Sequence, residues 1–201
     1  LNFKQSLKAH PKYPNLQAVP IPVALALFDA ESGEQLTLNS AALFENGVKD
    51  GVYLFDQEQA RIEFTGVKAK PVVSLLRNFS APVNLEFNYS YKELAFLLQY
   101  ETNGFNRWQA TQTLLERILL NDQPADIYVQ AMLNTLPGVI EQDPLLASRL
   151  FDVPTEGYLG SRIDVDYRPS KIQEKRNALL NKLARAFADT AKEIYLSLDP
   201  D

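Results

Sequence analysis

The histidine His10 is the only imidazole in the chain that could serve in acid–base catalysis or bind a metal ion. It precedes Pro11 in a proline-rich stretch, whereas catalytic and zinc-binding histidines usually stand on a rigid element with partner side chains within reach. Because the chain has no cysteine, a metal site would need carboxylates for its other ligands. We interpret His10 as a surface residue, and we expect no catalytic residue, cofactor-binding residue or metal ligand in this chain.

Acidic residues and glycines offer two further candidates. Asp164 and Asp166 could bind calcium weakly or act in acid–base chemistry, but the Asp-x-Asp-x-Asp-Gly spacing of a calcium loop is missing. The sequence GYLG at 157–160 could form a nest of main-chain amides for an anion. We favour a solvated loop for the first candidate and a plain loop turn for the second. Neither a glycine-rich phosphate loop nor a His-Glu-x-x-His zinc motif occurs in the sequence.

Two large side chains, the aromatic Trp108 and the cationic Arg77, could either bind a ligand or pack against the rest of the protein. Trp108, the single tryptophan, follows Arg107 and could be a stacking platform or a cation–π site. Its helical spacing from Leu115 and the nearby Phe105 favour a position in the core. Arg77, next to an apolar run, is either a buried ion-pair partner or a surface residue.

Composition restricts the function classes further. The chain has 201 residues and a net charge of −5, with both signs spread along it. It has no basic stripe with interleaved aromatic residues, so nucleic acid is not an expected partner. No apolar run approaches the roughly 20 residues of a membrane span. The absence of cysteine suits a reducing cytoplasm, where we expect the protein to reside. The first residue is not Met, and we expect the chain to be an excised fragment.

The first part of the chain predicts β structure. Short apolar or alternating segments are separated by Gly, Pro and Asn turns, which is typical of a β-sandwich. No segment between them has the length of a crossover helix, so the sheets should be antiparallel. The clearest alternation has Val83, Leu85, Phe87 and Tyr89 on one face. The expected strands are 2–8, 23–28, 36–38, 52–55, 61–65, 71–77 and 83–89.

From Ser90 the apolar period becomes helical. Ser90 and Glu93 have the spacing of a capping box, Asn103-Gly104 should end the first helix, and Asn106 should cap the second. A long polar connection is expected at 154–169, before a last helix capped by Ser170. The fold class is thus α+β in two segregated parts, an antiparallel β-sandwich at 1–89 and an all-α helical array at 90–201 that begins a superhelix. The other expected helices cover 91–100, 125–136 and 144–151.

The junction carries a family resemblance. Residues 71–83 read PVVSLLRNFSAPV, and residues 94–115 contain Phe105-Asn106-Arg107-Trp108. This stretch resembles the bacterial aminopeptidase N family of gluzincin zinc metallopeptidases, in which the first motif closes a small β-sandwich and the second opens a C-terminal helical domain. The resemblance is strongest over residues 20–120.

The resemblance implies a non-catalytic segment. In that family the zinc ligands and a Gly-Ala-Met-Glu-Asn motif lie upstream, and this sequence contains neither. The full-length enzyme would use zinc to remove N-terminal amino acids from peptides, whereas this segment would bind no zinc. It would support the catalytic domain of the same polypeptide and begin the helical wall around the active site. The alternative is a stand-alone β-sandwich and helical-repeat module for protein interactions.

Overall fold

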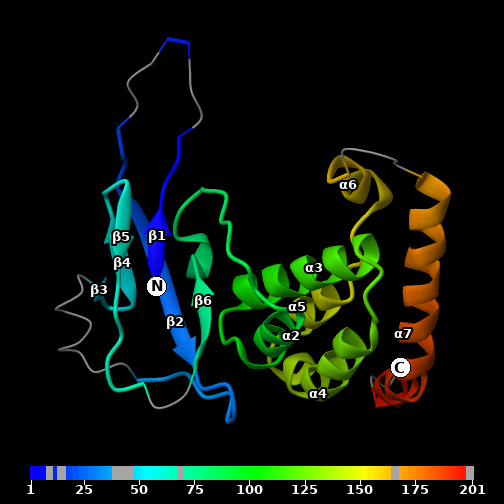
Figure 1. The fold of residues 1–201 in the computed structure, drawn as a ribbon. Helices are drawn as coiled ribbons and strands as arrows, with labels where there is room; N and C mark the ends of the chain where they lie inside the picture. The colour runs from blue at the N-terminus through cyan, green and yellow to red at the C-terminus, as the bar shows by residue number, and fades with distance from the viewer. Residues whose placement is uncertain (8–10, 13–16, 38–47, 68–69, 164–167, 198–201) are drawn as a thin grey trace. The chain divides into compact units, whose positions relative to one another are not determined.

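In the described part of the chain, every strand precedes residue 76 and every α-helix follows residue 90, as the computed structural model shows (Figure 1). The structure describes residues 1–7, 11–12, 17–37, 48–67, 70–163 and 168–197. The chain divides into two compact units, Leu1–Phe87 and Asn88–Asp201. Each unit is built from its own sequence pattern, alternating in the first and helical in the second.

The first unit consists of two antiparallel sheets. One pairs β1 with β5, and the other has the order β3-β4-β2-β6. β2 is an inner strand of the larger sheet because it pairs with β4 along one edge and with β6 along the other, and five of its eight residues are buried. The strands are β1 Asn2–Lys4, β2 Ile21–Phe28, β3 Val48–Lys49, β4 Val52–Phe55, β5 Gln59–Arg61 and β6 Val72–Leu75.

Aromatic rings connect the two sheets. The ring of Phe3 on β1 lies 5.4 Å from that of Tyr53 and 5.7 Å from that of Phe55, both on β4. Aromatic pairs at such centroid separations add to the stabilisation that burial provides. The core of the larger sheet continues along β2 and β6, where Leu25 pairs with Leu75 and Phe28 with Val72. The prediction of antiparallel sheets is confirmed.

The expected strand at 83–89 was wrong. No strand is formed there, and Val83 and Leu85 remain 39% and 41% exposed. Alternation describes how side chains would face a sheet, but a strand also needs a neighbouring main chain to pair with. Of the other expected strands, 61–65 has only Arg61 in a strand, and 2–8 is a strand from Asn2 to Lys4. Residues 36 and 37 form no strand, although the neighbouring Gln35 forms an isolated bridge to Phe28, and residue 38 lies outside the described residues.

A short 3-10 turn, η1 (Arg77–Phe79), follows β6 with unusual backbone angles. Leu76, Asn78 and Phe79 have φ values of 54°, 56° and 52°, a region that residues with a Cβ rarely occupy. Arg77 is half-buried, with its guanidinium carbon 6.0 Å from the ring centroid of Phe28. The cation–π contact gives Arg77 a packing role on the larger sheet.

The second unit is an array of six helices in the described residues. The buried residues recur at helical spacing on each long helix, which explains why these segments pack as an array. The largest fully buried side chains include Leu94, Leu98, Leu114, Leu115, Tyr128, Met132, Leu150 and Leu159. The helices are α2 Tyr91–Tyr100, α3 Gly104–Leu120, α4 Asp126–Gln142, α5 Pro144–Leu150, α6 Glu156–Ser161 and α7 Pro169–Ser197. The α+β class with two segregated parts is confirmed.

Helix starts follow local capping rules. The capping box predicted at α2 is present: the Ser90 amide donates to Glu93 Oε2 over 2.7 Å, and the Glu93 amide donates to Ser90 Oγ over 3.2 Å. The cap predicted for α3 was wrong, because Asn103 rather than Asn106 accepts the capping hydrogen bond. Asn103-Gly104 therefore starts α3 instead of ending α2, whose last helical residue is Tyr100 and whose C-cap is Glu101.

Three other helix boundaries differ from expectation. α4 continues past residue 136 through Pro137 to Gln142, since Leu136 and Val139 are both buried on its inner face. The polar connection expected at 154–169 contains the short helix α6. Ser170 lies inside α7, which begins at Pro169. The Thr155 side chain caps α6 by accepting a hydrogen bond from the Tyr158 amide, so a local signal marks the start of this helix.

Side chains that donate to main-chain carbonyl oxygens join the helices. The Tyr128 hydroxyl donates to Leu150 O over 2.7 Å, and Gln112 Nε2 donates to Asp152 O over 2.8 Å. On α7, Lys175 Nζ donates to Leu119 O over 2.9 Å, and Arg176 Nε donates to Pro154 O over 2.8 Å. Leu119 and Leu150 lie in the last turns of α3 and α5, where carbonyl oxygens have no intrahelical donor, and Asp152 and Pro154 lie in the connection between α5 and α6.

Candidate functional site

The structure describes only some of the site candidates of the sequence. His10, Asp164 and Asp166 lie outside the described residues. The GYLG sequence at 157–160 lies within α6 and is helical, so the loop turn expected there was wrong. Trp108 is half-buried on α3 and lines an open pocket between α3 and α5.

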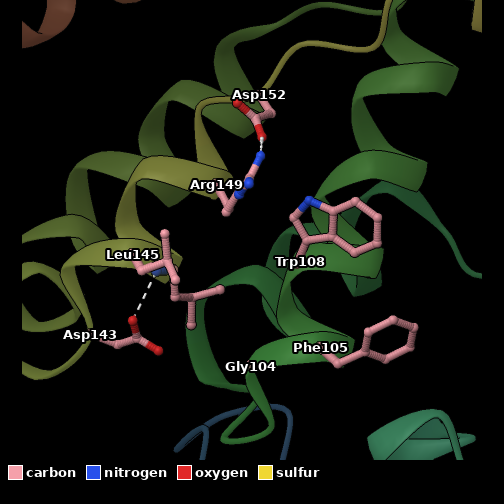
Figure 2. A pocket seen from close by; sticks show the side chains of 8 residues that line it. Gly104, Phe105, Trp108, Asp143, Leu145, Arg149 and Asp152 are labelled. Carbon is pink, nitrogen blue, oxygen red and sulfur yellow. Dashed lines mark hydrogen bonds and ion pairs between the residues drawn. The ribbon is translucent and has the colours of Figure 1, made fainter.

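The α3–α5 pocket has a volume of about 440 Å³. Figure 2 shows the ring of Trp108 on one wall and leucine side chains on the opposite wall. Three charged side chains complete the lining, so the pocket has apolar walls and polar ends. The lining residues are Gly104, Phe105, Trp108, Asp143, Leu145, Leu146, Arg149 and Asp152.

A close approach of two helix starts shapes the floor of this pocket. A Cβ atom on Gly104 would lie 3.3 Å from Leu146 Cδ2, so the absence of a side chain lets α3 and α5 meet here. Phe105 and Trp108 are three residues apart and therefore project from neighbouring positions of α3. Their ring centroids lie 6.0 Å apart and their planes are tilted by 43°. The result is an aromatic wall rather than a fully buried pair.

The polar ends of the pocket are held by short-range contacts. Arg149 Nη1 lies 3.2 Å from Asp152 Oδ2, and both side chains are more than half exposed. Asp143 Oδ1 accepts a 2.9 Å hydrogen bond from the Leu146 amide and so caps α5. No lining side chain is a serine, threonine, cysteine, lysine, tyrosine or histidine. The lining thus lacks these groups, and its charged groups are those of Asp143, Arg149 and Asp152.

Arg107 of the Phe-Asn-Arg-Trp motif contacts the turn between α2 and α3. Glu101 is fully buried, and its Oε1 accepts a 2.7 Å hydrogen bond from the Asn103 amide. Arg107 Nη2 donates to Gln99 O over 3.3 Å. Burial lowers the pKa of Arg107, and the nearby Glu101 carboxylate raises it. A guanidinium stays charged in proteins, so Arg107 and Glu101 provide charge compensation within this turn.

A second, smaller pocket of about 240 Å³ lies between the α3–α4 connection and α7. Its charged groups are paired: Lys175 Nζ lies 2.6 Å from Asp122 Oδ1, and Lys182 Nζ lies 2.7 Å from Asp126 Oδ1. The hydrogen bond from each lysine lowers the pKa of its aspartate. Because each lysine is engaged by a carboxylate, this pocket offers little attraction to an anion.

Within the residues that the structure describes, no group of three or more His, Cys, Asp and Glu side chains could hold a metal ion. None of the described helices is long and apolar enough to cross a lipid bilayer.

Comparison with known domains accounts for nearly the whole chain. Residues 1–88 match a domain of unknown function, DUF3458, described as having an Ig-like fold. Residues 91–201 match DUF3458_C, a domain of unknown function described as ARM repeats, over more than half of the chain. The chain belongs to the DUF3458_C family. ARM repeats stack helices so that each contacts mainly its neighbours, in agreement with the helical array of the second unit.

Individual relatives of this DUF3458_C member are aminopeptidases. The chain is 32% identical over 204 residues to aminopeptidase N of Escherichia coli (strain K12), covering 97% of this chain and 23% of the relative. It is 28% identical over 185 residues to aminopeptidase N of Haemophilus influenzae, covering 87% and 20%. The resemblance to the aminopeptidase N family is thereby confirmed. The chain spans only about a fifth of the length of these relatives.

A solved structure is similar over both units. Legionella pneumophila aminopeptidase A in complex with aspartic acid matches with a TM-score of 0.69 and 25% sequence identity, covering 90% of this chain and 21% of that chain.

The residues that line the α3–α5 pocket were largely missed by sequence reasoning, since Leu145, Arg149 and Asp152 lie some forty residues from Trp108. The spacing of Phe105 and Trp108 was the only local signal for it.

Proposed function

We propose that this chain is the non-catalytic, C-terminal-side portion of a zinc-dependent aminopeptidase that removes N-terminal amino acids from peptides. The observation that carries the proposal is the 32% identity to aminopeptidase N along 97% of this chain. The sequence contains no His-Glu-x-x-His motif, so the zinc ligands and the general base would be supplied by a catalytic domain of the same polypeptide. The metal there would activate water for attack on the N-terminal peptide bond.

In this proposal the two parts have different mechanical roles. Residues 1–89 form a β-sandwich domain that spaces and supports the catalytic domain. Residues 90–201 begin the helical wall that encloses the active site and limits substrates to peptides. The bounds of the two family models, 1–88 and 91–201, support this division. The enzyme would work in the cytoplasm, where thiols stay reduced and proteins are rarely stabilised by disulfides, so a chain without cysteine suits this compartment.

Activity measurements test the proposal. The purified 201-residue chain should not hydrolyse alanyl or leucyl arylamides, with or without added zinc, while Escherichia coli aminopeptidase N in the same assay provides the positive control. Turnover by the chain that a chelator abolishes would refute the idea that catalysis lies elsewhere. The source reading frame supplies a second test, because the proposal requires a peptidase domain with a zinc motif encoded directly upstream.

A stand-alone interaction module is the alternative function. The description of residues 91–201 as ARM repeats favours it, since arrays of this kind present binding surfaces. The same reading frame distinguishes the two: a start codon immediately before Leu1 and no peptidase domain upstream would favour the module.

A further inference from the structure

We propose that the α3–α5 pocket is a docking site for a peptide segment of a partner protein, one that presents a bulky apolar side chain next to a lysine or arginine. The pocket volume of about 440 Å³ falls within the range of roughly 300–1,000 Å³ that is typical of binding pockets. The inference does not depend on the proposed aminopeptidase function, because it uses only the lining of the pocket.

The apolar walls of the pocket favour a protein partner. Leu145 is 70% exposed and faces the pocket whose other wall is Trp108 (Figure 2). Tryptophan and arginine are enriched among the residues that dominate binding at protein interfaces, and Trp108 and Arg149 both line this pocket. An apolar side chain placed between Trp108 and Leu145 would remove both apolar walls from water, which favours binding.

The charges of the pocket indicate which residue should lie next to the apolar side chain in the partner peptide. Arg149 is paired with Asp152. Asp143 uses one oxygen to cap α5, and among the described residues no cation pairs with it. Two carboxylates and one guanidinium leave the lining with a net charge of −1. A phosphate or carboxylate ligand would be repelled by this balance, whereas a lysine or arginine beside the apolar anchor would complement Asp143.

The single tryptophan gives a direct measurement. Because Trp108 is the only tryptophan and lines the pocket, its emission reports occupancy. The probes are acetylated and amidated hexapeptides with one leucine or phenylalanine next to one lysine. Their blocked termini exclude capture by a site that recognises a free N-terminus. Control peptides replace the apolar residue with glycine or the lysine with glutamate. We expect the apolar–lysine peptides to change Trp108 emission with a Kd on the order of 1 mM or tighter, and both controls to bind more weakly.

Two chain variants locate the binding. Leu145→Glu should weaken binding about tenfold or more, as removal of a central apolar anchor does. Leu196→Glu on α7, where the leucine is 65% exposed, is the matched control and should leave binding unchanged. Asp143→Asn keeps a good helix cap but removes the charge, so it should abolish the preference for the lysine peptide over the glutamate peptide.

Several outcomes would overturn the proposal. One is the absence of any emission change together with no binding in calorimetry. Another is binding that Leu145→Glu leaves intact. A stronger response to the glutamate peptide would also overturn it, because the charge argument would then have the wrong sign. Emission that changes with chain concentration alone would identify a second copy as the occupant instead of a partner peptide.

Discussion

The hydroxyl of Tyr128 donates a 2.7 Å hydrogen bond to the main-chain carbonyl oxygen of Leu150, although 22 residues separate the two positions. Both residues are fully buried. The bond joins the first turn of α4 to the last residue of α5 and satisfies a carbonyl at a helix end. The position of α5, and therefore of the α3–α5 pocket, depends on this contact.

Tyr128→Phe should destabilise the chain. The substitution keeps the ring but leaves the buried Leu150 carbonyl without its donor, which typically costs about 1–3 kcal/mol. Urea denaturation followed by circular dichroism measures the free energy of unfolding. Tyr195→Phe is the matched control, since Tyr195 is 67% exposed, and its unfolding free energy should stay close to that of the unmodified chain. Equal stabilities of all three proteins would contradict a structural role for the bond.

Stability at alkaline pH should depend on the same hydroxyl. Burial raises the pKa of Tyr128 well above its ordinary value of about 10, and the Asp152 carboxylate adds to the shift. The unfolded chain therefore ionises first, so the contribution of Tyr128 is fully present below about pH 10 and is lost as the pH rises towards the folded pKa.

The measurement is the difference in unfolding free energy between the unmodified chain and Tyr128→Phe from pH 8 to about pH 11, the range around the ordinary tyrosine pKa. The difference should be constant up to pH 9 and shrink above pH 10. Taking the difference cancels the smaller upward pKa shifts of Tyr53 and Tyr158. A difference in unfolding free energy that grows with pH would show that the folded state favours the ionised form of Tyr128 over the neutral form.

Arg176→Met should weaken the attachment of α7 to α6. Arg176 Nε donates to the carbonyl of the buried Pro154, and Arg176 Nη1 lies 3.2 Å from Glu156 Oε1. Loss of the donor leaves that carbonyl unsatisfied, at a cost of about 1–3 kcal/mol.

Hydrogen exchange of α6 amides should accelerate in Arg176→Met. In Arg185→Met, which alters an exposed arginine of the same helix, exchange should not change. Arg176→Lys should restore only part of the protection, because one ammonium lacks the fork of donors that serves two acceptors. Full protection in Arg176→Met would assign the attachment of α7 to its apolar residues alone.

Asp143→Ala should destabilise α5, whereas Asp143→Asn should not. Asp143 caps α5 through the Leu146 amide, and removal of such a cap costs about 0.5–2 kcal/mol. Asparagine caps as well as aspartate does, so only the alanine variant should lower the denaturation midpoint. Similar losses in both variants would show that the charge of Asp143, rather than the capping bond, stabilises α5.

Local signals in the sequence predicted the start of α2 but not the start of α3. Ser90 and Glu93 form the only capping box before the apolar run of α2. Both residues of the box lie in this local stretch, so the sequence alone predicts the start of the helix. Asn103 and Asn106 are both acceptable caps, and the sequence alone does not choose between them, whereas in the structure Asn103 accepts the capping hydrogen bond from the Asn106 amide. The helix expected at 125–136 continues as α4 to Gln142, with Val139 buried beyond Pro137.

Non-local pairing explains the larger errors. The alternation at Val83 to Tyr89 is as regular as that of any real strand, but pairing is a property of two segments and no single segment encodes it. The same limit applies to the α3–α5 pocket. Phe105 and Trp108 are neighbours in sequence and could be seen as a pair, whereas Asp143, Arg149 and Asp152 reach them only because α5 packs on α3 and α4.

The hydrogen bonds that join the helices of the second unit require a particular side chain at the donor position but no particular side chain at the acceptor position. Tyr128, Gln112, Lys175 and Arg176 all donate to main-chain carbonyl oxygens, and every amino acid supplies such an oxygen. The acceptor residues can thus be exchanged for others of suitable size without loss of the bond, whereas each donor position tolerates few replacements. Homologues could therefore diverge widely at the acceptor positions and keep the same arrangement of helices, so the donors are the better markers for tracing this array in distant sequences.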